Sequence, residues 1–179
     1  KTINREIRRA FRWRSIGTAF RNNTIICKFN EFRLFTNVTS TSSNAFGSSG
    51  ISEFTVSPKF RTFAYQTFAY CTNLTEIRLT EGVTTLGDQW VWGCKNIILI
   101  DLPSTITTIT SAGIHTYAAS GQKNYIVICR AVTPPTLGSS NYLTKLTAVY
   151  VPDESVDAYK TATRWKDFAW RELPDKNGS

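Results

Sequence analysis

The chain has 179 residues, of which 41% are hydrophobic and 13% aromatic, so it can fold as one domain around a core and is not a disordered chain. Its formal net charge is +8, and most of this charge lies in residues 1–33, which hold nine Lys and Arg residues and two acids. No apolar run approaches the roughly 20 residues that cross a bilayer, which excludes a transmembrane helix.

The first predicted element is a basic capping helix over residues 1–15. Ile3, Ile7, Ala10 and Phe11 fall on one helical face, and arginines occupy the other. This arginine face is a candidate site for an anionic surface, and a solvated helix face is the alternative explanation. Its members are Arg5, Arg8, Arg9, Arg12 and Arg14.

A first coil over 16–37 is followed by repeats of about 23 residues over 38–124. The apolar pairs that recur at this spacing are Phe60 and Phe63, Val83 and Leu86, and Ile106 and Ile109. The apolar triplet Leu74, Ile77 and Leu79 recurs as Ile97, Ile100 and Leu102. Three clear units are predicted over 38–59, 60–82 and 83–105, with a degenerate fourth from Ile106 and a one-residue deletion before Ile51.

Each unit predicts the same succession of short elements. In 74–79 the apolar alternation favours a strand with one buried face. A turn and a second extended piece over 83–86 follow, and 88–95 is predicted as one or two helical turns. One coil cannot bury its apolar side alone, so the coils are expected to stack with strands about 4.8 Å apart.

The end of the chain predicts a closing segment over 125–173 and a loose tail over 174–179. Tyr125–Cys129 and Thr147–Val151 are predicted strands, and a helix is expected from Pro152 to about Ala162. The residues expected to close the core are Trp165, Phe168, Ala169 and Trp170.

The unit resembles the BspA-type leucine-rich repeat of bacterial surface proteins, which reads Val-x-x-Ile-Gly-x-x-Ala-Phe-x-x-Cys-x-x-Leu-x-x-Ile-x-Ile-Pro. The matching positions of one unit are Val83, Leu86, Gly87, Cys94, Ile97, Ile100, Leu102 and Pro103. Departures are Trp90-Val91 in place of Ala-Phe, and Thr80 in place of the proline. The resemblance covers about 16–173. It implies a single-domain α/β repeat solenoid over 1–179, a short, strand-rich, right-handed superhelix with a helical N-terminal cap and a C-terminal closing segment.

The same resemblance implies a secreted or cell-surface protein of host-associated anaerobic bacteria. We therefore expect an extracellular or outer-surface location, with an export signal removed before Lys1, and adhesion to a protein or extracellular-matrix partner. A glycan-binding module of a surface uptake system is the first alternative, and anionic-surface binding through residues 1–33 is the second. A nucleic-acid ligand is not expected.

The candidate ligand site is the outward face of the repeated strands. The predicted outward residues are Glu53, Thr55, Glu76, Arg78, Leu99 and Asp101. A solvated strand face is the alternative. Exposed aromatic residues beside this face would favour a partner surface, because Trp, Tyr and Arg dominate binding hot spots. The candidates are Tyr65, Tyr70, Trp90 and Trp92, although one of the two tryptophans is expected to fill the core instead.

Residue types that carry catalysis or bind metals lack the required spacing. The four cysteines Cys27, Cys71, Cys94 and Cys129 form no C-x-x-C pair, so zinc is not expected. Cys71 and Cys94 occupy equivalent positions and are predicted to be buried free thiols, with a disulfide between them as the alternative. His115, the only histidine, is predicted to lie in a surface loop. We predict no catalytic residue, cofactor or metal site, and a binding module that is not an enzyme.

Overall fold

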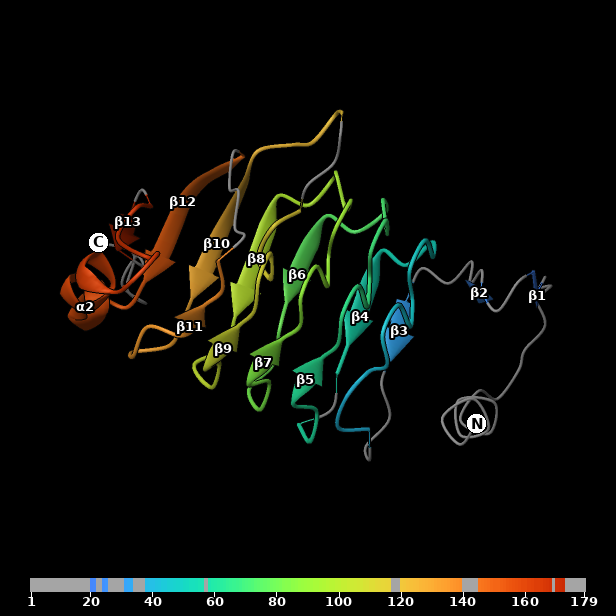
Figure 1. The fold of residues 1–179 in the computed structure, drawn as a ribbon, viewed down its shortest axis with the longest axis horizontal. Helices are drawn as coiled ribbons and strands as arrows, with labels where there is room; N and C mark the ends of the chain where they lie inside the picture. Colours follow the sequence, from blue (N-terminus) through green and yellow to red (C-terminus); the bar gives the residue numbers. More distant parts are fainter. Residues whose placement is uncertain are drawn as a thin grey trace.

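The computed structural model shows a solenoid of stacked, mostly parallel strands (Figure 1). The structure describes residues 20–21, 24–25, 31–33, 38–56, 58–116, 120–139, 145–168 and 170–172. The predicted capping helix over 1–15 and the tail over 174–179 lie outside the described residues.

Two parallel sheets form two sides of the solenoid. The larger sheet has five strands in the order β13-β12-β10-β8-β6. These strands are β6 (Glu76–Arg78), β8 (Leu99–Leu102), β10 (Tyr125–Cys129), β12 (Leu146–Val151) and β13 (Trp170–Glu172). The smaller sheet has four strands in the order β11-β9-β7-β5. They are β5 (Thr62–Phe63), β7 (Thr85–Leu86), β9 (Thr108–Ile109) and β11 (Thr136–Leu137). Three successive coils contribute one strand to each sheet, through β6 and β7, β8 and β9, and β10 and β11, which is the arrangement that the repeated unit predicts.

The N-terminal coils contribute shorter pairings. Strands β1 (Phe20–Arg21) and β2 (Thr24–Ile25) pair antiparallel. Strand β3 (Glu31–Arg33) pairs parallel with β4 (Glu53–Thr55), so the stacking of parallel strands already begins before the first clear repeat.

The strand registers confirm the predicted period. Thr62 pairs with Thr85, and Thr85 pairs with Thr108. Side chains follow the same step, because the amide of Asn73 donates to the carbonyl of Gly50, 23 residues earlier. Equivalent residues therefore lie above one another in successive coils.

The first coil of this series is one residue shorter than the next, as predicted. The amide of Phe46 donates to the carbonyl of Thr67, whereas the amide of Phe68 donates to the carbonyl of Trp90. These are equivalent bonds, since Phe46 and Phe68 hold the same place in their coils and their rings stack at 5.4 Å. The deletion is absorbed in the turns and leaves the strands in phase.

The third side of each coil consists of turns, and the prediction of helical turns over 88–95 is wrong. Gln89 and Gly93 have positive φ angles of 53° and 76°, which a right-handed helix does not contain. The preceding coil has the same two left-handed positions at Gln66 and Tyr70. Amides of this side bond to carbonyls of the neighbouring coil, so the turns stack through backbone bonds that a helix would have used internally.

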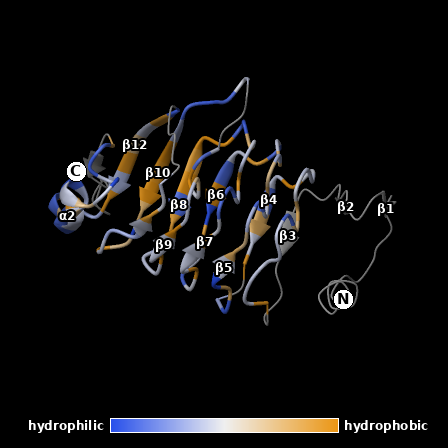
Figure 2. Ribbon diagram, in the orientation of Figure 1, coloured by the Kyte–Doolittle hydropathy of each residue, from blue (hydrophilic) through white to orange (hydrophobic). Residues whose placement is uncertain are grey.

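The core is a continuous apolar column between the three sides. Aromatic rings fill its first coils: Phe54 stacks on Phe68 at 4.4 Å, and Phe63 contacts Trp90 at 4.8 Å. Trp90, one of the two tryptophans considered for the core, is fully buried, and its indole N–H donates to the carbonyl of Gly113. Further along, aliphatic residues such as Ile100 take over. Figure 2 shows the apolar character of β8, β10 and β12 in orange, and the inward residues of these strands belong to the column.

Cys71 and Cys94 are buried free thiols, as predicted, and Cys129 is a third. Cys71 and Cys94 occupy equivalent positions, and each thiol donates to a carbonyl of the preceding coil, Phe46 at 3.1 Å and Phe68 at 3.0 Å. Burial raises the pKa of both thiols, and it raises the pKa of Cys129 to about 11. These thiols therefore act as small core residues with a hydrogen-bond donor. Cys27 lies outside the described residues.

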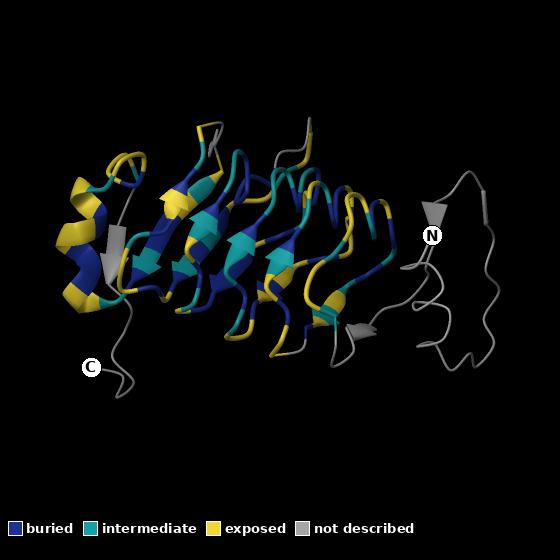
Figure 3. Cartoon of the chain, turned by 60° about the horizontal axis from the view of Figure 1, so that its bottom comes forward, coloured by how far each residue is buried: buried dark blue, intermediate teal, exposed yellow. Residues whose placement is uncertain are grey.

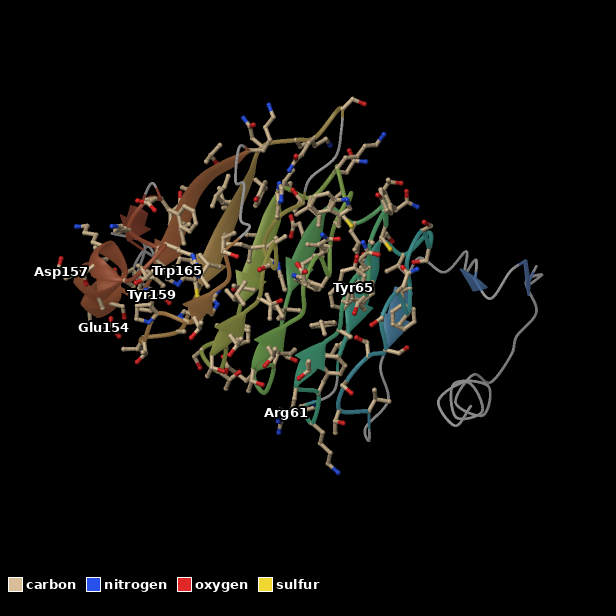
Figure 4. The ribbon with its side chains drawn as sticks, viewed as in Figure 1. Arg61, Tyr65, Glu154, Asp157, Tyr159 and Trp165 are labelled. Atoms are coloured by element: carbon tan, nitrogen blue, oxygen red, sulfur yellow. The ribbon has the colours of Figure 1, made fainter. Side chains whose placement is uncertain are left out.

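The C-terminal segment closes the core, as predicted. After β12 the chain forms a 3-10 turn over Asp153–Ser155 and helix α2 over Val156–Thr161. Figure 3 shows α2 at the end of the solenoid with its exposed residues facing outward. Tyr159 and Trp165 lie side by side between α2 and the strands, with ring centroids 5.2 Å apart (Figure 4). Phe168 packs on Trp165, whereas Ala169 and the Trp170 side chain lie outside the described part.

Candidate binding surface

The large sheet has one face toward the core and one face outward. In β6 the burial alternates exposed, buried, exposed, with Ile77 pointing inward. Because parallel neighbours share register, the residues that face outward form rows across the strands. We call them the outer sheet face. Its members in the large sheet are Glu76, Arg78, Leu99, Asp101, Ile126, Ile128, Ala148 and Tyr150. Glu53 and Thr55 hold the equivalent positions of β4, which pairs with β3 and not with the large sheet, and we count them with this face.

Four of the six predicted site residues are exposed on this face, and two are not. Glu53, Thr55, Glu76 and Arg78 are exposed. Leu99 and Asp101 lie in the predicted outward rows, in register with Glu76 and Arg78, but they keep only 8% and 6% exposure. The Asp101 carboxylate is covered by the guanidinium groups of Arg130 and Arg78, and Leu99 lies beside Ile126 of the neighbouring strand. A role of all six residues in ligand binding stays a prediction.

Asp101 is the centre of an ionic network on the outer sheet face. Arg130 binds it in a bidentate manner, with Nε 2.8 Å from Oδ1 and a terminal guanidinium nitrogen 2.9 Å from Oδ2. Arg78 lies 3.5 Å from the same carboxylate and 3.0 Å from Glu76. The hydrogen bond to Asp101 raises the pKa of Arg130, so this guanidinium stays charged. The two arginines therefore shield the Asp101 carboxylate from solvent. The polar groups that this part of the face presents to a partner are the N–H donors of the two guanidinium groups.

The neighbouring half of the outer sheet face is apolar. Leu99 pairs with Ile126, and Ile126 pairs with Ala148. In the next outward row, Ile128 of β10 lies beside Tyr150 of β12. Ile126, Ile128 and Tyr150 are partly exposed. Figure 2 shows the change in character between the largely blue β6 and the orange β10. The face thus combines a fixed charged cluster with adjoining apolar rows.

Arg130 and the outward residues of β10 and β12 were not predicted. All five residues of Tyr125–Cys129 are apolar, so the sequence itself shows no alternation there, and the burial at the first, third and fifth positions is seen only in the structure. The prediction stopped at the clear repeats and did not extend the face into the closing segment. No sequence pattern indicated that Arg130 reaches back to Asp101.

Two exposed aromatic residues lie on the turn side instead of the outer sheet face. Tyr65 and Tyr70 are 44% and 55% exposed, and Figure 4 shows Tyr65 among the side chains of this part. The ring of Tyr70 covers Gly93, where a Cβ would lie 2.7 Å from Tyr70 Cε1. Trp92, on the same side, is half-buried. The aromatic residues weighed in the sequence therefore do not flank the predicted face.

The single histidine is buried, and its prediction as a surface-loop residue is wrong. His115 is 3% exposed and contacts Trp92 edge-to-face at 5.2 Å. After β9, the turns over 111–114 lead the chain into the core. His115 is therefore buried, although its segment has no apolar periodicity in the sequence. Burial lowers the pKa of His115, so the imidazole is held neutral.

The predicted anionic-surface site lies outside the described residues. The arginine face, with Arg5, Arg8, Arg9, Arg12 and Arg14, belongs to the undescribed part. Within the described ranges, no group of three or more His, Cys, Asp and Glu residues is placed to hold a metal ion. No described helix has the length and apolar character to cross a membrane.

Comparison with known proteins supports the repeat. A family model described as "BspA type Leucine rich repeat region (6 copies)" matches residues 13–117. The matched stretch is more than half of the chain and includes every strand from β1 to β9. No curated protein matches the chain.

Proposed function

Since the chain belongs to the BspA-type leucine-rich-repeat family, we propose that it is a non-catalytic module that binds a protein ligand through its outer sheet face. Repeats of this class serve as protein-interaction scaffolds, and stacked coils present a continuous surface. The proposal is that the ligand is a host-matrix protein and that the chain acts at the cell surface or after secretion. That setting is inferred from the family alone.

The observation that carries the proposal is the junction between the ionic and the apolar rows. Protein interfaces combine an apolar centre with charged groups at its border, and Arg and Tyr are enriched among the residues that hold the partner. Here Arg130 and Arg78 are fixed by Asp101, and Tyr150 lies in the same outward row as Ile128. The guanidinium groups are held in place before binding, so little conformational freedom is lost on association.

The test uses surface-immobilised fibronectin, laminin and collagen as defined matrix probes. Binding of the full chain is compared with that of Ile128→Thr/Tyr150→Thr, which retains residues that favour strands. We expect at least one probe to bind and the double variant to bind it about tenfold or more weakly, as for the loss of hot-spot residues. Val132→Thr is the matched control, because Val132 is an exposed residue just after β10 and outside the outer sheet face.

Circular dichroism and urea unfolding show whether each variant is folded before its affinity is compared. The proposal fails if none of the three probes binds, or if the control weakens binding as much as the double variant does.

A further inference from the structure

A line of three lysines runs along one rim of the large sheet, separate from the outer sheet face. Lys95, Lys123 and Lys145 are exposed and precede strands β8, β10 and β12. The amide of Lys123 donates to the carbonyl of Lys95 at 2.9 Å, and the carbonyl of Lys145 accepts a bond from the Tyr125 amide at 3.0 Å. Successive coils therefore place one lysine each shortly before the point at which these strand arrows begin (Figure 1). We call this the lysine rim.

The lysine rim lacks acidic partners in its part of the chain. Between Gln89 and Val151 the sequence has one acidic residue, Asp101, and its carboxylate is bound by arginines. None of the ion pairs among the described residues involves a rim lysine. The backbones of neighbouring rim lysines are about one strand spacing of 4.8 Å apart, so their charges repel one another and attract an anionic ligand.

An exposed aromatic ring stands at one end of the lysine rim. The ring of Tyr70 covers Gly93, and the Lys95 amide bonds to the Gly93 carbonyl at 2.9 Å. The ring thus packs on the backbone two residues before the first rim lysine. A flat aromatic surface packs against the apolar face of a sugar ring, while a neighbouring ammonium group binds an acidic substituent of the same polymer.

We propose that the lysine rim and Tyr70 bind an acidic polysaccharide, bearing sulfate or carboxylate groups, that lies across the coils. One cation per coil matches a polymer with regularly spaced anions. A single-stranded nucleic acid fits less well, because it needs aromatic rings between the cations on which its bases stack. The exposed aromatic residues of the described part, Tyr65 and Tyr70, both precede the first rim lysine. This site uses no residue of the outer sheet face, so either proposal can fail alone.

The test measures binding of the full chain to heparin and to polygalacturonate by titration calorimetry at several NaCl concentrations. The rim variant is Lys95→Gln/Lys123→Gln/Lys145→Gln. The matched control is Lys59→Gln/Lys160→Gln/Lys166→Gln, which removes the same charge at exposed lysines elsewhere. Both variants keep the basic residues of 1–33, so their difference reports on the rim.

We expect the rim variant to bind at least one of these glycans about tenfold more weakly than the control. The salt slope should fall by about one for each lysine removed. Tyr70→Ala should also weaken binding, with little change in the salt slope. In a mass-spectrometric acetylation footprint, bound glycan should protect the three rim lysines but not Lys160 or Lys166.

Three results would overturn the proposal. Equal weakening in the rim variant and the control would show a general charge effect. Absence of selective protection in the footprint would place the glycan elsewhere. Tighter, rim-dependent binding of a thymidine oligonucleotide than of either glycan would identify a nucleic-acid site instead.

Discussion

Equivalent backbone carbonyls of the small sheet accept hydrogen bonds both in the middle coils and at the closing segment, but the donors differ between the two regions. In the small sheet, the carbonyls of Arg61 and Phe63 in one coil accept bonds from backbone amides of the next. The donors are the amides of Thr84 and Gly87. Strand β11 is the last strand of the small sheet. There the equivalent carbonyls are those of Pro135, just before the strand, and Leu137, and both accept hydrogen bonds from side chains. These donors are the indole N–H of Trp165 at 2.6 Å and the guanidinium of Arg164 at 2.7 Å.

This difference shows how the solenoid ends without another coil. A strand edge with free carbonyls is a template for further pairing, and buried carbonyls need a partner. Trp165 supplies a hydrogen bond and a large apolar ring at once, which a backbone amide cannot do. Repeated coils thus rely on an identical neighbour, and the closing segment relies on a few residues with no repeated counterpart.

The largest effect is expected at the closing segment, from Trp165→Ala. The change removes a fully buried ring that packs on Tyr159, together with the bond to the Pro135 carbonyl. Burial of this size corresponds to about 3–5 kcal/mol of unfolding free energy. Urea unfolding followed by circular dichroism measures the loss.

Trp165→Phe is the control for that experiment, because it keeps an aromatic ring and removes only the donor. The unsatisfied carbonyl should cost about 1–2 kcal/mol. If Trp165→Ala cost less than the phenylalanine variant, the closing role of this residue would be wrong.

The next effect concerns close packing between middle coils, tested by Gly87→Ala. A Cβ at Gly87 would collide with the carbonyl oxygen of Phe63 and lie 2.6 Å from the carbonyl carbon of Ala64. Both are backbone atoms that cannot rotate away, so we expect a loss of about 2–3 kcal/mol. Gly121→Ala is the comparison, since nothing lies within 4 Å of its Cβ and only its positive φ of 73° opposes alanine, at about 1 kcal/mol. Thermal unfolding of the two variants should rank them in this order, and the reverse order would contradict the packing argument.

The period and the core were predictable because they depend on local pattern. Ile77 and Ile100 recur in phase, and a strand with one buried face is the simplest structure that satisfies their alternation. The turn side was not predictable in the same way. Apolar residues such as Trp90 and Cys94 have a spacing that suits either helical turns or stacked turns, and Gln89 gives no residue-level signal for its positive φ.

The outer sheet face was predictable only in its first half. Within the repeats, the exposure of Glu76 and Arg78 follows from alternation. The burial of Asp101 depends on Arg130, and Leu99 pairs with Ile126 across an irregular segment that breaks the 23-residue period. Contacts of this kind join residues that no repeat relates, so a pattern in the sequence cannot reveal them.

The smallest effect is a dependence of stability on pH, at the point where the middle coils meet the closing segment. Burial lowers the pKa of His115 from its ordinary value of 6.5, so below that pH the unfolded chain binds a proton that the folded chain does not. Stability should therefore be complete above about pH 6.5 and decline as the pH falls toward 5, before most carboxylates titrate.

His115→Phe keeps an aromatic contact with Trp92 and removes the titration. The melting temperature of the native chain should fall more than that of the variant between pH 7 and pH 5. Because His115 is the only histidine, NMR titration of its imidazole gives the folded-state pKa directly, and a value above 6.5 would reverse the expected sign.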